Sequence, residues 1–223
     1  PELMESIIAE GRADIVALAR PLLADPELPN KLKAGKADQV APCLRCMACI
    51  SESFVPYVRY CSRIRRCPSN PTAYKEIPAS QVKKTEQPKK VLVIGGGPSG
   101  MEAAAELAER GHHVILCERE NELGGAMRHA KYVPFKQKVD QLMHVMIRRL
   151  ERSGAEIRLH TAATPTLVES LHPDVIVAAL GAKAKKPEVA GAEHAIIAED
   201  ALQRIDSLGQ NVAIVGGGLV GCE

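Results

Sequence analysis

The 223-residue sequence predicts an α/β protein built around parallel strands. Two apolar segments, residues 91–94 and 212–215, each run into a glycine-rich turn of the form GxGxxG, and a helical stretch follows the first turn. Aromatic residues make up only 3% of the chain, whereas glycine (17 residues), alanine and valine are plentiful. Small residues let helices pack closely on parallel strands, so the composition favours α/β layers over an aromatic-rich sandwich.

Charge and hydropathy exclude several classes of protein. The formal net charge is only +2, with 29 basic against 27 acidic residues, which argues against nucleic acid as a partner. No segment approaches the roughly 18 consecutive apolar residues of a membrane span, and the first residues lack the form of a signal peptide. We therefore expect a cytoplasmic protein that does not bind a membrane.

The first 40 residues alternate helical and strand-like patterns. Residues 2–10 predict an amphipathic helix that ends at Gly11, residues 13–19 form an apolar run of buried-strand length, and a polar helix follows through Lys33. Such a segment cannot bury a core by itself, so we expect it to be the end of a larger domain. The chain begins with Pro1, and we expect it to be a piece of a longer polypeptide.

Five of the seven cysteines lie between residues 43 and 67. Cys43, Cys46 and Cys49 follow a CxxCxxC pattern, and both Cys61 and Cys67 are available as a fourth ligand. Four thiolates are compatible with a [4Fe–4S] cluster and with a structural zinc ion. In a chain without an export signal, this clustering favours a metal or redox site over a disulfide framework.

From residue 90 the pattern is that of a nucleotide-binding domain. Residues 76–89 are rich in Pro, Ser, Lys, Gln and Thr and predict a surface linker. Beyond it we expect helices over 101–110 and 135–153, and strands over 91–94, 113–118, 156–159, 175–180 and 212–215.

The first glycine-rich turn carries the strongest functional signal. Gly95 permits the tight turn, Gly97 lets the backbone approach a pyrophosphate, and Gly100 lets helix and strand pack closely. Glu118 at the end of the next strand can accept hydrogen bonds from both hydroxyls of a ribose. The turn therefore predicts a dinucleotide site for a ribose without a 2′-phosphate.

The second turn, Gly216, Gly218 and Gly221, predicts another nucleotide site. Its acidic residue is not in the sequence, so the choice between NADH and NADPH stays open.

The order of these parts resembles one family. A strand ending in Ala19-Arg20-Pro21, the CxxCxxC motif, the segment Cys67-Pro68-Ser69-Asn70-Pro71, and the turns GGGPSG and GGGLVG are similar to the iron–sulfur flavoenzymes of the old yellow enzyme group. These are the NADH:flavin oxidoreductases that include 2,4-dienoyl-CoA reductase, enoate reductase and trimethylamine dehydrogenase.

The resemblance implies five parts along the chain. They are the C-terminal end of an FMN-binding (β/α)8 barrel (1–40), an iron–sulfur segment (41–75), a linker (76–89), an incomplete Rossmann-like FAD-binding domain (90–209) and the start of an NAD(P)H-binding domain (210–223).

The resemblance also implies a role for particular residues. Ala19 and Arg20 belong to the FMN phosphate site, although the family usually has glycine in place of Ala19. Cys67 is the fourth cluster ligand because it precedes the family's x-x-Asn-Pro sequence, whereas the usual spacing favours Cys61. The implied sets are Cys43, Cys46, Cys49 and Cys67 for the cluster, Gly95, Gly97, Gly100, Glu118, Gly125 and Gly181 for FAD, and Gly216, Gly218 and Gly221 for NAD(P)H.

The implied function is an oxidoreductase that moves electrons from NAD(P)H through FAD and the [4Fe–4S] cluster to FMN, for reduction of an enoate or enoyl-CoA C=C bond. The alternatives are an amine dehydrogenase or electron-transfer module that passes electrons to a partner protein, and a zinc-stabilised nucleotide-binding module. A homo-oligomer also stays open. No catalytic residue is assigned, and we expect the 223 residues alone to be inactive.

Overall fold

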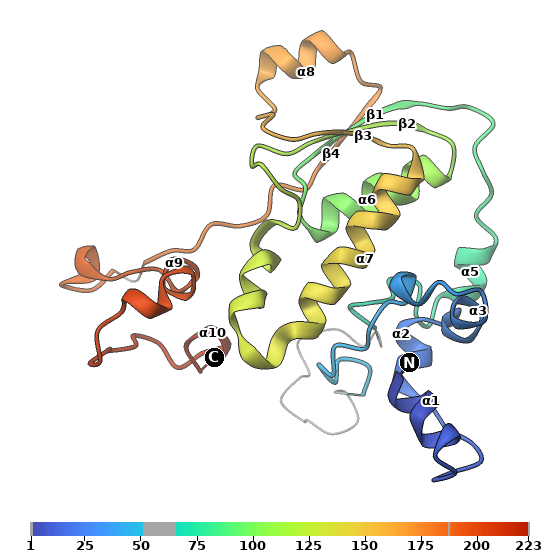
Figure 1. The fold of residues 1–223 in the computed structure, drawn as a ribbon. Coiled ribbons are helices and arrows are strands. Elements are labelled where there is room, and N and C mark those ends of the chain that lie inside the picture. The colour runs from blue at the N-terminus through green and yellow to red at the C-terminus, as the bar shows by residue number, and fades with distance from the viewer. Residues whose placement is uncertain (1, 51–65, 187, 223) are drawn as a thin grey trace. The chain divides into compact units, whose positions relative to one another are not determined.

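The computed structural model describes residues 2–50, 66–186 and 188–222. The chain divides into two compact units, Pro1–Thr85 and Glu86–Glu223. In Figure 1 the first unit runs from blue to teal and the second from green to red.

The second unit contains a four-stranded parallel sheet with the order β3-β2-β1-β4. In the central pairings, Leu92 lies opposite Ile115 on one side and Ile176 on the other. The strands are β1 (Lys90–Ile94), β2 (His113–Cys117), β3 (Glu156–Arg158) and β4 (Val175–Ala178). The α/β fold predicted from the sequence is confirmed, with β4 ending at Ala178 rather than at residue 180.

Helices cover both faces of this sheet, as Figure 1 shows: α6 and α7 lie on one side and α8 on the other. Their bounds are α6 (Pro98–Glu109), α7 (Gln137–Ser153) and α8 (Pro165–Leu171). Val91, Leu92 and Val93 of β1 are at most 2% exposed. Leu171 of α8 packs against Leu92 and Ile115. A continuous apolar strand is typical of a parallel sheet buried on both faces.

The long helix α7 matches the predicted helix over 135–153 except at its start. Residues Pro134–Lys136 form a 3-10 turn, and the α-helix begins at Gln137. Val139, Leu142 and Leu150 are buried at helical spacing. Gly154, with a φ of 86°, ends the helix in the left-handed conformation that glycine adopts without strain.

Arg149 of α7 pairs with three carboxylates on α6. Its guanidinium nitrogens lie 2.7 Å from Glu102, 2.8 Å from Glu106 and 2.6 Å from Glu109. The hydrogen bonding that Arg149 donates to Glu109 is the largest of the effects that raise the pKa of Arg149 well above its ordinary value. Arg149 therefore stays positively charged and ties α7 to α6.

We expect Arg149→Met to lower the free energy of unfolding by about 1–2 kcal/mol, because it removes three ion pairs and leaves three like charges on one helix. Partial exposure of all four side chains limits the effect, since water screens the charges. Urea unfolding followed by circular dichroism would measure it. Exposed Arg152, on the same helix, is the control, and an equal loss in Arg152→Met would contradict a specific role for Arg149.

The same cluster predicts a loss of stability in acid. Burial raises the pKa of Glu106, but the hydrogen bonds and charges of Arg110 and Arg149 outweigh it, and the pKa is lowered from its ordinary 4.5. A lowered pKa in the folded state contributes stability above the unfolded value, and this stability is lost as the pH falls through the folded value. We expect the wild-type protein to lose stability below about pH 4.5 more steeply than Glu106→Gln. Parallel slopes in pH-dependent unfolding would contradict this.

The first unit consists of short helices joined by irregular segments: α1 (Glu2–Ala9), α2 (Arg20–Ala24), α3 (Leu28–Lys33) and α5 (Glu76–Ser80). The helix predicted over 2–10 and the one through Lys33 are confirmed. The strand expected at 13–19 is wrong, because this segment is irregular and Ile15 is 83% exposed. A strand needs a hydrogen-bonded neighbour, and no described residue pairs with this segment as a strand.

The strand expected at 212–215 is wrong for the same reason. The segment is irregular, and Val212, Ile214 and Val215 are exposed. The sheet of the second unit ends at β4, so within the described residues this apolar run has no strand beside it.

The remaining elements of the second unit are short. They are the 3-10 helices Gly125–Tyr132, Ala192–His194 and Ile205–Ser207, and the α-helices α9 (Ala198–Gln203) and α10 (Leu219–Cys222).

Candidate functional site

The first glycine-rich turn joins β1 to α6, and two of its glycines are required by the fold itself. Gly95 has a φ of 107°, and a Cβ there would overlap the carbonyl oxygen of Ala179. A Cβ on Gly100 would overlap the carbonyl oxygen of Gly95 and lie 3.3 Å from Cβ of Ala179. The turn is also tied to the sheet, since the Gly95 N–H donates to the Cys117 carbonyl at 2.8 Å.

Gly97 differs from these two because the protein leaves room beside it. It is the N-cap of α6 with an ordinary φ of −73°. A Cβ there would meet only Cα of Gly125, at 3.9 Å. The first N–H groups of a helix have no partner within the helix and carry partial positive charge. An open approach to such a helix end fits the pyrophosphate of a dinucleotide.

Glu118, directly after β2, is buried beside this turn. The side chain is 7% exposed. Oε2 accepts the N–H of Gly96 at 2.6 Å, and Oε1 accepts the N–H of Glu120 at 2.9 Å. A carboxylate oxygen has a second lone pair, so Glu118 can still accept one hydroxyl hydrogen on each oxygen. This chemistry fits the two hydroxyls of a ribose.

A second backbone segment packs against the turn at Gly124 and Gly125. The Gly124 N–H donates to the Gly96 carbonyl at 2.8 Å. Gly125 has a φ of 53°, and a Cβ there would lie 3.0 Å from Cα of Gly97. Arg128 stabilises this segment by two contacts. Its Nε donates to the Gly125 carbonyl at 3.1 Å, and its Nη1 lies 2.9 Å from Glu122.

The structure thus brings together five of the residues that the sequence suggests for FAD: Gly95, Gly97, Gly100, Glu118 and Gly125. The sixth, Gly181, follows β4 with a φ of 69° and open space around its Cβ position. Arg128 is a further residue at this turn. The sequence alone does not identify it as a site residue, because arginines are common on surface helices.

The second glycine-rich turn repeats the backbone geometry of the first. Gly216 has a φ of 114°, close to the 107° of Gly95. A Cβ on Gly221 would overlap the carbonyl oxygen of Gly216, as one on Gly100 would overlap that of Gly95. Gly218 has no atom within 4 Å of its Cβ position. The turn therefore has the local form of a nucleotide-binding loop.

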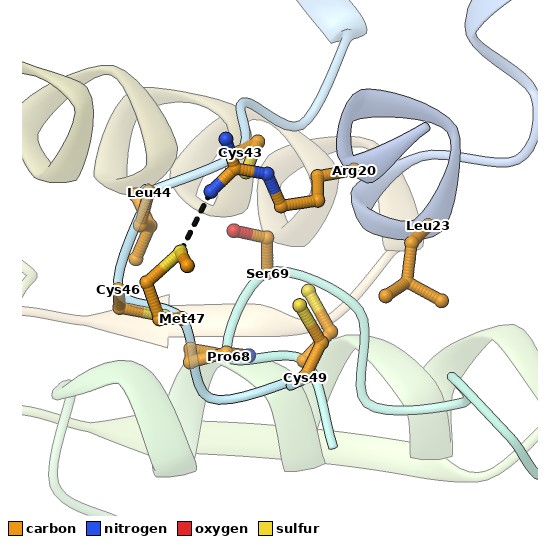
Figure 2. Close-up of a pocket in the computed structure, with 10 residues that line it drawn as sticks. Arg20, Leu23, Cys43, Leu44, Cys46, Met47, Cys49, Pro68 and Ser69 are labelled. Carbon is orange, nitrogen blue, oxygen red and sulfur yellow. Dashed lines mark hydrogen bonds between the residues drawn. The ribbon is translucent and has the colours of Figure 1, made fainter. Parts of the chain in front are cut away.

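Four cysteines of the first unit line one pocket, which Figure 2 shows in close-up. Cys43, Cys49 and Cys67 are partly buried and Cys46 is exposed, and each thiol is free. Among the residues that the structure describes, the lining is Arg20, Leu23, Cys43, Leu44, Cys46, Met47, Cys49, Cys67, Pro68 and Ser69. Cys61 lies outside the described residues.

The charges of two cysteines of the CxxCxxC motif act on the Cys67 thiol. Burial is the main effect that raises the pKa of the Cys67 thiol, and the charges of Cys46 and Cys43 add to it. Backbone hydrogen bonds from Ser69 and Asn70 act in the opposite direction.

The backbone around Cys46 is strained. Arg45 and Met47 have φ values of 57° and 61°, in the left-handed region that costs a non-glycine residue about 1–2 kcal/mol. Strain of this kind is characteristic of functional sites, where the surrounding structure imposes it. Here it turns the chain so that Cys43, Cys46 and Cys49 reach the same pocket.

Two buried polar residues hold the cysteine-bearing segments to α2. Asp25, 4% exposed, accepts the Ala41 N–H at 2.8 Å and pairs with Lys31 at 2.7 Å. Asn70, 7% exposed, donates to the Leu23 carbonyl at 2.9 Å. Asp25 thereby fixes the start of the CxxCxxC segment, and Asn70 fixes the turn that carries Cys67.

We expect Asp25→Asn to speed amide hydrogen exchange at Ala41 by about 10- to 100-fold, because it weakens a buried hydrogen bond to a charged group worth about 1.5–3 kcal/mol. Mass-spectrometric or NMR exchange would measure it. The exposed Asp14 provides a control of the same residue type in the same unit. Equal exchange at Ala41 in Asp25→Asn and Asp14→Asn would refute the anchoring role.

Ala19 and Arg20 lie at the start of α2, where the Ala19 carbonyl accepts the Leu23 N–H at 3.2 Å. Nη1 of Arg20 donates to Sδ of Met47 at 2.8 Å. The structure therefore brings Arg20 into the cysteine pocket. No local pattern predicts this contact, because the two residues are 27 positions apart.

Comparison with known proteins identifies the family. A model of the family described as FAD dependent oxidoreductase matches residues 90–211, which is more than half of the chain. The chain belongs to this FAD-dependent oxidoreductase family. Its relatives place it among the flavoenzymes of the old yellow enzyme and trimethylamine dehydrogenase type, as their C-terminal part. The resemblance inferred from the sequence is confirmed.

Several relatives of this FAD-dependent oxidoreductase match along the entire chain. It is 40% identical over 230 residues to an NADH oxidase of Thermoanaerobacter brockii, covering 100% of this chain and 35% of that protein. It is 39% identical over 223 residues to a cinnamate reductase of Clostridium sporogenes, covering 100% and 33%. The chain thus spans about a third of the length of these relatives.

Among solved structures, 2-naphthoyl-CoA reductase in complex with 2-naphthoyl-CoA is similar with a TM-score of 0.87 and 31% identity, over 99% of this chain and 33% of that one. None of the helices in the described part of this oxidoreductase has the length and apolar character needed to span a lipid bilayer.

Proposed function

We propose that this chain is the electron-transfer part of an NAD(P)H-dependent flavin and iron–sulfur oxidoreductase that reduces an activated C=C bond of the enoate or enoyl-CoA type. The open approach at Gly97 beside the buried Glu118 carboxylate is the observation that carries the proposal. The relatives named as a cinnamate reductase and an NADH oxidase support the reaction class.

FAD fits the first glycine-rich turn. Gly97 and the N-terminus of α6 would receive the pyrophosphate, Glu118 the ribose hydroxyls, and Gly125 a second contact with the dinucleotide. Gly181, after β4, would line the same site from a neighbouring strand end. Bound FAD would exchange either a hydride or single electrons. The chain's own contribution is to hold the dinucleotide in place and to supply donors that are already oriented.

A [4Fe–4S] cluster fits the four thiols of the cysteine pocket, Cys43, Cys46, Cys49 and Cys67. Thiolate sulfur is the ligand that such clusters prefer, and each thiolate binds a different iron. A structural zinc ion needs its four ligands around one position. Zinc is therefore the alternative for the same four thiols, and analysis of iron, zinc and acid-labile sulfide separates the two.

NAD(P)H and FMN complete the proposal. Gly216, Gly218 and Gly221 would begin the NAD(P)H site, since their turn has the geometry of the FAD turn. Arg20 has four guanidinium N–H groups besides the one that contacts Met47, and it would bind the FMN phosphate together with the backbone at Ala19. The protein would act in the cytoplasm. A homo-oligomer and an electron-transfer partner protein are separate alternatives that this proposal does not require.

The test uses anaerobically purified full-length protein. We expect stoichiometric iron, acid-labile sulfide and flavin, bleaching of the flavin absorbance by NADH or NADPH, and recovery of the absorbance on addition of cinnamate or an enoyl-CoA. Zinc without sulfide would refute the cluster. Bleaching by dimethylamine or trimethylamine, with no recovery on any C=C substrate, would instead assign an amine dehydrogenase.

A further inference from the structure

Arg20 is the one charged side chain among the described residues that line the cysteine pocket. The other lining residues, apart from the cysteines and Ser69, are apolar: Leu23, Leu44, Met47 and Pro68. Figure 2 shows the guanidinium reaching over the pocket toward Met47, which follows Cys46 in the chain. The hydrogen bond from Nη1 to Sδ of Met47, at 2.8 Å, holds it there.

A guanidinium in this position affects any redox group that the thiols hold. The guanidinium of an arginine carries a positive charge. Thiolates and a bound cluster carry negative charge, and each electron added makes the group more negative. A nearby positive charge stabilises the reduced form more than the oxidised form, so it raises the reduction potential. Water at the exposed guanidinium weakens this effect without changing its sign.

We propose that Arg20 sets the reduction potential of the cluster bound by Cys43, Cys46, Cys49 and Cys67, and that Met47 positions its guanidinium. This inference rests on the proposed function, because it requires the cluster. It assigns Arg20 a task beyond the FMN phosphate: a single side chain would lie between an anionic cofactor and the redox centre, and its charge would act on both.

The experiment is a potentiometric titration of the full-length protein, with the reduced cluster detected by its electron paramagnetic resonance signal. We expect Arg20→Gln, which keeps a hydrogen-bond donor but removes the charge, to lower the midpoint potential. Arg20→Lys keeps the charge and should stay closer to the wild type. Met47→Leu should shift the potential in the same direction as Arg20→Gln, by a smaller amount, because it frees the guanidinium.

Arg12 provides the matched control. It is a charged arginine of the same unit that pairs with Glu10 at 2.9 Å and does not line the pocket. Arg12→Gln should leave the midpoint potential unchanged. Equal shifts in Arg12→Gln and Arg20→Gln, or an unchanged potential in Arg20→Gln, would overturn the inference. Loss of FMN from Arg20→Gln with no change in potential would assign Arg20 to the phosphate alone.

Two further outcomes keep the inference separate from the proposed function. Absence of the cluster signal in reduced wild-type protein would refute the proposed cluster itself. If Arg20→Gln fails to assemble a cluster, Met47→Leu decides, because it leaves the four thiols and the Arg20 side chain in place but removes the contact that holds the guanidinium. An unchanged midpoint potential in Met47→Leu would then overturn the role of Arg20.

Discussion

Alanine at Gly97 is expected to weaken FAD binding strongly while the fold stays intact. A Cβ at this position would meet only Cα of Gly125, at 3.9 Å, and the φ of −73° suits any residue. The methyl group would instead occupy the space through which a pyrophosphate reaches the N-terminus of α6. We expect the affinity for FAD to fall by about 100-fold or more, equivalent to about 3 kcal/mol. Flavin content and titration of the apoprotein with FAD would measure this.

Gly100→Ala is the comparison for Gly97→Ala, because it should lose FAD through damage to the fold rather than through blocked access. Its Cβ would overlap the carbonyl oxygen of Gly95, so the strand and helix must move apart, at a cost of about 3 kcal/mol in stability. Gly100→Ala should therefore lose both stability and FAD, whereas Gly97→Ala should lose FAD alone. Tight FAD binding by Gly97→Ala would show that the dinucleotide does not approach the turn there.

Serine at Cys67 is expected to remove iron and acid-labile sulfide from the protein, whereas serine at Cys61 should leave both in place. Cys67 shares the pocket of the CxxCxxC motif and is electrostatically coupled to Cys46 and Cys43. The oxygen of serine is a poor replacement for a soft thiolate ligand. Metal analysis and the visible absorbance of anaerobically purified variants would measure the loss.

The pair Cys61→Ser and Cys67→Ser decides between two sequence arguments, one from spacing and one from the local x-x-Asn-Pro sequence. Loss of iron in Cys61→Ser with retention in Cys67→Ser would reverse the assignment. Circular dichroism of both variants should match the wild type, so that a loss of metal is not confused with a loss of fold.

Local patterns were enough to predict most of the second unit. The signals that predict these elements lie close together in the sequence. They are the glycines of the turn between β1 and α6, the continuous apolar run of β1, and the helical spacing of apolar residues in α7. The strands expected at 13–19 and 212–215 failed because a strand is defined by hydrogen bonds to a neighbour. An apolar run indicates that a segment could pair, but it does not show that a partner lies beside it.

The contacts that build the cysteine pocket were beyond sequence reasoning for a related reason. Asn70 contacts the Leu23 carbonyl across 47 positions, and Arg20 contacts Met47 across 27. Neither residue type is distinctive at its position, since asparagine is common in turns and arginine at helix starts. The resemblance to a family assigned Arg20 to a phosphate, but only the fold showed that it also lines the thiol pocket.

The anchoring of both cysteine segments to α2 has a consequence for how this chain can vary. Asp25 holds the segment before Cys43, and Asn70 holds the turn after Cys67, so neither depends on the length of sequence between Cys49 and Cys67. Closing a longer connection costs only about 0.6 kcal/mol for each doubling of its length. A change in the length of this connection should therefore leave both anchors, Asp25 at Ala41 and Asn70 at the Leu23 carbonyl, in place.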